Sequence, residues 1–159
     1  MKLLFLPLIV LLPAFTIAQA TTLSINQIDS MVAAIDSTKG LNTFISEGSV
    51  MRKGTHKIIG GFSDYFYSNN SKVLLKVTNS FSAYTVEETD YYFHHDSLIF
   101  VRAVIHKTPR SPNKEITTGQ YYFQNGVLIY KQERGKPYTR PEIFWKLAET
   151  YIADAKSNL

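Results

Sequence analysis

The chain has 159 residues, 45% of them hydrophobic, which is enough material for one domain with its own core. It contains no cysteine, so disulfides, cysteine nucleophiles and lipid-modified cysteines are all excluded. The formal net charge of +4 is a mild excess that an ordinary solvated surface accounts for; if it forms a patch, anionic glycans or lipid headgroups suit an exported chain better than nucleic acid.

The first twenty residues have the pattern of an export signal. Lys2 provides a positive start, and Leu3–Leu12 is an apolar run too short to span a bilayer. Pro13 ends this run before a segment of small residues. We therefore expect residues 1–20 to be a signal peptide; the alternative, an N-terminal membrane anchor, is disfavoured by the short run.

Two cleavage positions fit the small-residue rule, one after Ala18 and one after Ala20. Cleavage would release residues 19–159 or 21–159, and we expect residues 21–159 to form a single secreted or periplasmic domain without a stable membrane anchor. A cysteine-free exported chain fits a bacterial periplasm or surface better than an animal secretion.

The first predicted element is an amphipathic helix from Ser24 to Lys39. Ser24 and Gln27 form a Ser-x-x-Gln capping box, and isoleucines and valine follow at helical spacing. Gly40 is expected to end the helix in a left-handed conformation.

Three strands are predicted next, over Phe44–Arg52, Lys57–Tyr67 and Lys72–Thr78. The third alternates between apolar and polar residues, which indicates one face in water. Gly60-Gly61 interrupts the second strand, and glycines at such a place mark a bulge, a bend or a close backbone approach.

The centre of the chain uses one pattern twice, in Tyr91–Val101 and Tyr121–Lys131. In the second copy Asn125-Gly126 separates aromatic and aliphatic runs, which predicts a hairpin with a type I′ turn. The first copy has His95-Asp96 at the equivalent place.

Simple pairing around these two-residue turns sets the expected register. Tyr91 would face Phe100, Tyr121 would face Tyr130, and each phenylalanine before a turn would face the leucine after it. The same register would bring Glu87, Arg102 and His106 onto one face of the sheet.

The last elements are an exposed loop over Thr108–Lys114 and a C-terminal helix. Thr139-Arg140-Pro141-Glu142 reads as a second capping box, and a continuous apolar stripe follows it. Trp145 lies at the edge of this stripe and is expected to clamp the helix to the sheet.

These elements predict an α+β fold: a single curved antiparallel β-meander of about six or seven strands, with the N-terminal and C-terminal helices packed on one face. A sheet that closes further, into a partly open barrel, is the alternative.

The Tyr-Tyr-Phe-x-Asn-Gly-x-Leu-Ile hairpin at 121–129 resembles hairpins of small exported bacterial proteins that are uncharacterised, and Ala18-Gln19 resembles export signals of the Bacteroidetes type. The hairpins are also loosely similar to the MORN-type repeat with its Tyr-x-x-Gly turn. They depart from it in their longer interval and in Asp96, which stands where that repeat has glycine. The resemblance implies no activity and transfers no functional residue.

His94-His95-Asp96 is the sharpest polar cluster in the sequence. Because neighbouring residues of a strand point to opposite faces, the two histidines do not readily share a metal, and an exposed turn is the preferred interpretation. Glu88 and Asp90 would share a face about 7 Å apart, a spacing that paired glycosidase carboxylates can have, but acidic residues on a wet strand are common.

No nucleophile elbow, Ser-His-Asp set or phosphate-binding glycine loop is present. We therefore predict no catalytic residue, no metal and no cofactor, and favour a non-catalytic role.

The remaining functional signal is aromatic, since the chain has ten tyrosines. If both helices cover one face, tyrosines line the other, where their rings suit glycan or protein contacts. The other interpretation, slightly favoured, is that cross-strand tyrosine pairs only stabilise a half-exposed sheet. The first interpretation predicts an exported binding module that uses Tyr91, Tyr121 and Tyr130 on an open sheet face for an unknown protein or glycan ligand. The alternative is a small periplasmic ligand carrier or hydrolase-type enzyme with Glu87, Arg102 and His106 at the wall of a pocket between sheet and helices.

Overall fold

The computed structural model describes residues 22–83, 85–107, 116–136 and 140–159. The expected signal peptide, the loop predicted over Thr108–Lys114 and Thr139 of the second capping box lie outside these residues.

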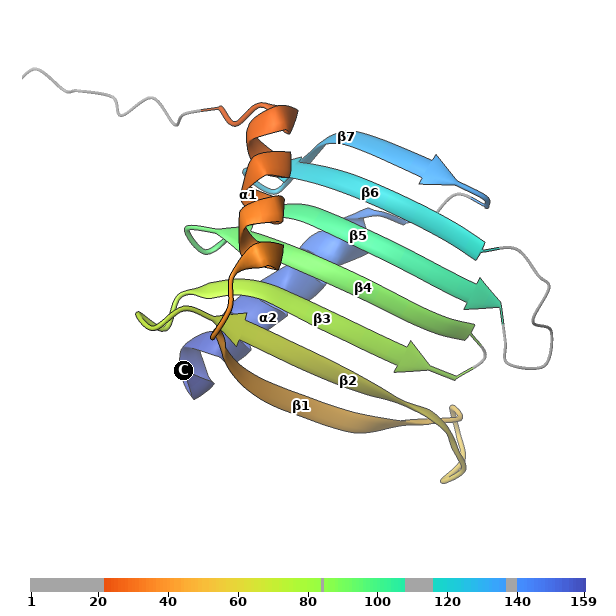
Figure 1. Ribbon diagram of the computed structural model, residues 1–159. Helices are drawn as coiled ribbons and strands as arrows, with labels where there is room; N and C mark the ends of the chain where they lie inside the picture. Colours follow the sequence, from red (N-terminus) through yellow and green to blue (C-terminus); the bar gives the residue numbers. More distant parts are fainter. Residues whose placement is uncertain (1–21, 84, 108–115, 137–139) are drawn as a thin grey trace, which may run out of the picture.

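The fold is a seven-stranded antiparallel sheet with one helix near each end of the described chain, and the predicted α+β meander is confirmed (Figure 1). Every strand pairs with its neighbours in sequence, so β1 and β7 are the edges of the sheet within the described residues. Neither helix there is long and apolar enough to cross a membrane. The elements are α1 (Ile25–Ser37), β1 (Asn42–Met51), β2 (Ile58–Ser68), β3 (Leu74–Ser82), β4 (Thr85–His94), β5 (Ser97–Lys107), β6 (Ile116–Gln124), β7 (Val127–Arg134) and α2 (Glu142–Asn158).

The two helices lie on opposite faces of the sheet, so their predicted placement on one face was wrong (Figure 1). α1 packs on a cluster that includes Tyr92, Phe100 and Tyr122, and α2 packs on a larger one that includes Tyr91 and Tyr121. Successive residues of a strand point to opposite faces, so the Tyr-Tyr pair of each hairpin makes both faces apolar near the turns. Each face therefore needs its own cover.

Both turns at the centre of the two hairpins are as predicted. His95 and Asp96 have φ of 48° and 55°, and Asn125 and Gly126 have φ of 50° and 78°, the left-handed values that a type I′ turn requires. A Cβ on Gly126 would lie 3.1 Å from the ring of Trp145, so this turn also packs against α2. The expected clamp between Trp145 and the sheet is confirmed.

A β-bulge after each turn changes the expected register. Phe93 pairs with Leu98 as predicted, but Tyr92 then pairs with Phe100, so Ile99 is an extra residue. Tyr91 consequently faces Val101 instead of Phe100. One extra residue moves the rest of the returning strand to the other face.

The second hairpin repeats this bulge with Ile129 as its extra residue. Tyr121 faces Lys131 instead of Tyr130, which faces Tyr122. The bulge thus belongs to the repeated motif.

The bulge in β5 separates the three residues that were expected to share a face. Glu87 faces Ile105, in the same alternate set as Tyr91 and on the α2 side of the sheet. Arg102 and His106 face Asp90 and Val86, in the same set as Tyr92 and on the α1 side. The predicted cluster of Glu87, Arg102 and His106 was therefore wrong.

The helix ends agree in part with their sequence signals. The capping box of α1 is confirmed, since the Gln27 backbone N–H donates to Ser24 Oγ at 3.3 Å and the Ser24 backbone N–H donates to Gln27 Oε1 at 2.8 Å. α2 instead begins after Pro141, its N-cap residue, without a side-chain capping bond. Gly60 lies at a bulge in the pairing of β1 with β2 and against the backbone of Ser82, as glycines within a strand indicated.

Candidate functional site

A pocket of about 560 Å³ opens between the sheet and α2. Its size falls in the range of small-molecule sites, about 300–1,000 Å³. Strands β1 to β4 form its floor and α2 forms its wall. The described residues that line it are Ser46, Phe62, Asp64, Asn79, Phe81, Glu87, Thr89, Tyr91, Phe144, Leu147, Thr150, Tyr151 and Asp154.

The pocket exists because α2 covers only part of its face of the sheet. Cross-strand pairing places Phe66, Val77 and Tyr91 in one transverse row, which the apolar side of α2 covers. Phe144 and Tyr151 of the helix contact this row through edge-on ring packing.

The next two rows form the floor of the pocket, and Tyr151 of α2 reaches the first of them. One row is polar, with Asp64 paired to Asn79 and Asn79 paired to Thr89. The row beyond it combines Phe62, Phe81 and Glu87. A ligand can therefore place a polar group on the first row and an apolar group on the neighbouring row.

Asp64 is the best-defined polar group of the pocket. Its side chain accepts hydrogen bonds from Asn79 Nδ2 at 2.7 Å and from the Tyr151 hydroxyl at 3.0 Å, and the residue is 8% exposed. Burial and the neighbouring Tyr91 and Asp64 raise the pKa of Tyr151, so its hydroxyl stays protonated and donates. Both hydrogen bonds therefore hold the carboxylate of Asp64 in one orientation.

Two of the six predicted ligand residues, Tyr91 and Glu87, line this pocket together. Tyr121 lies on the same face but is fully buried, with its ring 4.9 Å from that of Phe144 and its hydroxyl donating to Glu133 at 2.8 Å. The expected open face lined by Tyr91 and Tyr121 was therefore wrong, because α2 covers both rings.

The other three predicted residues lie on the α1 side of the sheet and do not meet. Tyr130, on the edge strand β7, is 44% exposed and packs beside Tyr122 of β6. Arg102 lies in the middle of β5, and His106 lies four residues further along that strand.

Arg102 belongs to a charge cluster that holds the end of α1 on the sheet. Its Nη2 atom lies 3.0 Å from Asp36 Oδ2 of α1 and 3.1 Å from Asp90 Oδ2 of β4. Lys76 Nζ completes the cluster at 3.1 Å from Asp36 and 3.3 Å from Asp90. Tyr92 donates its hydroxyl to Asp36 at 2.9 Å and accepts from Arg102.

The charges in this cluster balance, with two carboxylates facing two basic groups. Asp90 shares its face with Glu88, as expected for paired carboxylates, but Lys76 and Arg102 neutralise it. The arrangement is that of a structural latch, and it leaves no net charge for a ligand.

This latch should make stability depend on pH in the acidic range. Burial alone would raise the pKa of Asp36, but hydrogen bonds from Arg102, Lys76 and Tyr92 outweigh it and lower the pKa below 3.8. Asp36 therefore binds protons more readily when unfolded, so the free energy of unfolding should fall as pH drops through 3.8 and below.

Asp36→Asn should reduce this pH dependence and cost about 1 kcal/mol at neutral pH, since the groups are partly exposed. Urea denaturation across the acidic range measures both effects. An unchanged pH profile in Asp36→Asn would contradict the assignment of the pH dependence to Asp36.

The positive φ of His95 brings the rings of His94 and His95 to a centroid distance of 4.0 Å, so they do not point to opposite faces as expected. Burial and the neighbouring His95 lower the pKa of His94. Within the described residues, no group of three or more histidine, aspartate or glutamate side chains is placed to hold a metal.

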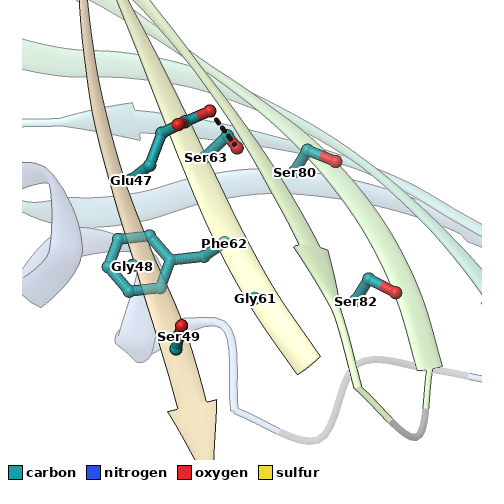
Figure 2. Close-up of a pocket in the computed structure, with 8 residues that line it drawn as sticks. All are labelled: Glu47, Gly48, Ser49, Gly61, Phe62, Ser63, Ser80 and Ser82. Carbon is teal, nitrogen blue, oxygen red and sulfur yellow. Dashed lines mark hydrogen bonds between the residues drawn. The ribbon is translucent and has the colours of Figure 1, made fainter. Parts of the chain in front are cut away.

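A second hollow of about 530 Å³ lies over β1, β2 and β3, at the end of the sheet beyond Glu47 (Figure 2). Ser63 donates to Glu47 Oε1 at 3.1 Å, and Ser80 and Ser82 extend the polar surface. All its described lining residues come from the sheet, with no helix to close it. It therefore encloses a small molecule less well than the pocket under α2.

No protein-family model, no curated protein and no solved structure matches the chain. Function is therefore inferred from the geometry and charge of the pocket.

Proposed function

We propose that this chain is an exported, non-catalytic binding protein that holds a small organic molecule in the pocket between the sheet and α2. The observation that carries the proposal is a hollow of about 560 Å³ with aromatic walls and a few oriented polar groups, the usual make-up of a ligand site. The proposal follows the alternative prediction of a small ligand carrier with a pocket between sheet and helices. It replaces the prediction that tyrosines on an open sheet face bind the ligand. Export follows only from the signal-like pattern of residues 1–20.

The chemistry of the lining supports binding over catalysis. The described residues at the wall include no histidine, lysine or arginine, so an imidazole base and a basic oxyanion partner are both missing from this part of the site. Asp64 is held by two hydrogen bonds, which suits a fixed recognition group.

A filled-pocket variant tests the proposal. Ser46 is exposed on β1 in the floor of the pocket, so Ser46→Trp should fill the space without disturbing the core. Fluorescence titration with the neutral aromatic probe N-phenyl-naphthylamine should show binding to the natural chain and an affinity weakened about tenfold or more in this variant.

Ile45→Trp is the matched control, because Ile45 is the preceding residue of the same strand, is 53% exposed and points to the other face. It should bind the probe like the natural chain. Equal affinity in Ser46→Trp, or no binding to the natural chain, would contradict the proposal.

A further inference from the structure

The described lining of the pocket under α2 carries negative charge and no positive charge. Asp64, Glu87 and Asp154 line it, and none of its described lining residues is basic. The whole chain has the opposite sign, with a formal charge of +4. The negative charge is therefore a local property of this site.

Asp64 is buried in this pocket without a basic partner among the described residues. It is 8% exposed, and its hydrogen-bond partners among the described residues, Asn79 and Tyr151, are both neutral. A buried carboxylate held only by neutral donors keeps part of its desolvation cost. On the other face, by contrast, Asp36 and Asp90 are each paired with Lys76 and Arg102.

Five aromatic residues line the pocket together with these carboxylates. Phe62 and Phe81 lie in the same row as Glu87, and Tyr91, Phe144 and Tyr151 line the helix side. Ring faces attract cations and also bury apolar groups. Aromatic rings do not serve as ligands for a metal ion, and the described acidic residues are not grouped as metal ligands.

We infer that the ligand is an organic cation, an amine with an apolar or aromatic body, whose ammonium group faces Glu87 and Asp64 while its body packs on the rings. This inference rests on the proposed function, since it assigns the ligand class of the same pocket. Asp154 of α2 adds its charge from the helix side.

Three probes that share one ring system test the charge preference. Calorimetric titration at neutral pH and low ionic strength should show naphthylethylamine binding about tenfold tighter than naphthylethanol, with naphthylacetate weakest. Added salt should reduce the advantage of the amine and leave the alcohol unchanged.

Glu87→Gln should weaken the amine about threefold to fivefold and leave the alcohol within about twofold. Glu88→Gln is the matched control, because it removes the same charge from the next residue, which faces the other side of the sheet. Equal effects of the two variants on the amine would overturn the inference.

The probes also separate failure of this inference from failure of the proposed function. If the alcohol and the amine bind equally and Ser46→Trp weakens both, the preference for a cation is wrong and the binding pocket stands. If none of the three binds, or if Ser46→Trp leaves their affinities unchanged, the proposed function itself is overturned.

Discussion

Phe144→Ala should lower the free energy of unfolding by about 3–5 kcal/mol, the range for removal of a buried aromatic side chain. Phe144 is 2% exposed, and its ring lies 6.0 Å from that of Tyr91 and 4.9 Å from that of Tyr121. It thus joins α2 to β4 and β6 at once. Since small domains are stable by about 5–15 kcal/mol in total, urea denaturation should register this loss easily.

Ile143→Ala is the control for this experiment, because Ile143 is the preceding residue of α2 and is 42% exposed. It should change stability by no more than about 0.5 kcal/mol. A loss below about 1 kcal/mol in Phe144→Ala would show that α2 does not depend on this ring. Phe144 also lines the pocket, so its truncation should weaken probe binding as well.

Most of the architecture is readable from the sequence because its signals are local. Asn125-Gly126 predicts its turn from backbone sterics, and Ser24 with Gln27 predicts the start of α1 from hydrogen bonding. The order of the strands then follows, because successive strands joined by short turns pair with their neighbours.

The faces of the strands were less predictable, because a bulge depends on the packing of whole strands. Ile99 and Phe100 both pack toward α1, which no alternating pattern anticipates. Every face assignment after Ile99 on β5 was consequently inverted, including those of Arg102 and His106. The same apolar density on both faces also concealed that the helices cover different sides.

Part of the pocket lining could be predicted from the sequence. Phe62, Asp64 and Phe66 alternate onto one face of β2, and a carboxylate between two aromatic residues on a core-facing row is a recognisable signal. Glu87 was expected at the wall of a pocket between sheet and helices, where it lies, whereas Tyr91 was expected on an open aromatic face. Leu147, Thr150 and Asp154 could not be assigned to the site without knowing where α2 lies, which depends on long-range packing.

The two faces use charge differently, and this contrast supports the inference that the ligand is a cation. On the α1 side four charged groups neutralise one another and fasten a helix. On the α2 side three carboxylates line a hollow without a basic partner among its described residues. The first pattern is complete without a ligand, whereas the second is complementary to a cation.

The repeated bulge offers the second large effect. Deletion of Ile99 should lower the free energy of unfolding by about 3–5 kcal/mol, because the residue is 3% exposed and packs in the cluster under α1. The register should nevertheless survive, since Ile99 is the residue without a cross-strand partner. Leu98 would still pair with Phe93 and Phe100 with Tyr92.

Deletion of Ile129, the equivalent residue of the second hairpin, separates the bulge from the buried side chain. Ile129 is 43% exposed on the edge strand, so its loss should cost only about 1 kcal/mol. Urea denaturation compares the two deletions, and cross-strand nuclear Overhauser effects between Asp90 and Arg102 report the register. Equal losses would mean that the bulge itself stabilises the hairpins, and a shifted register would mean that Ile99 also sets which face of β5 carries Arg102.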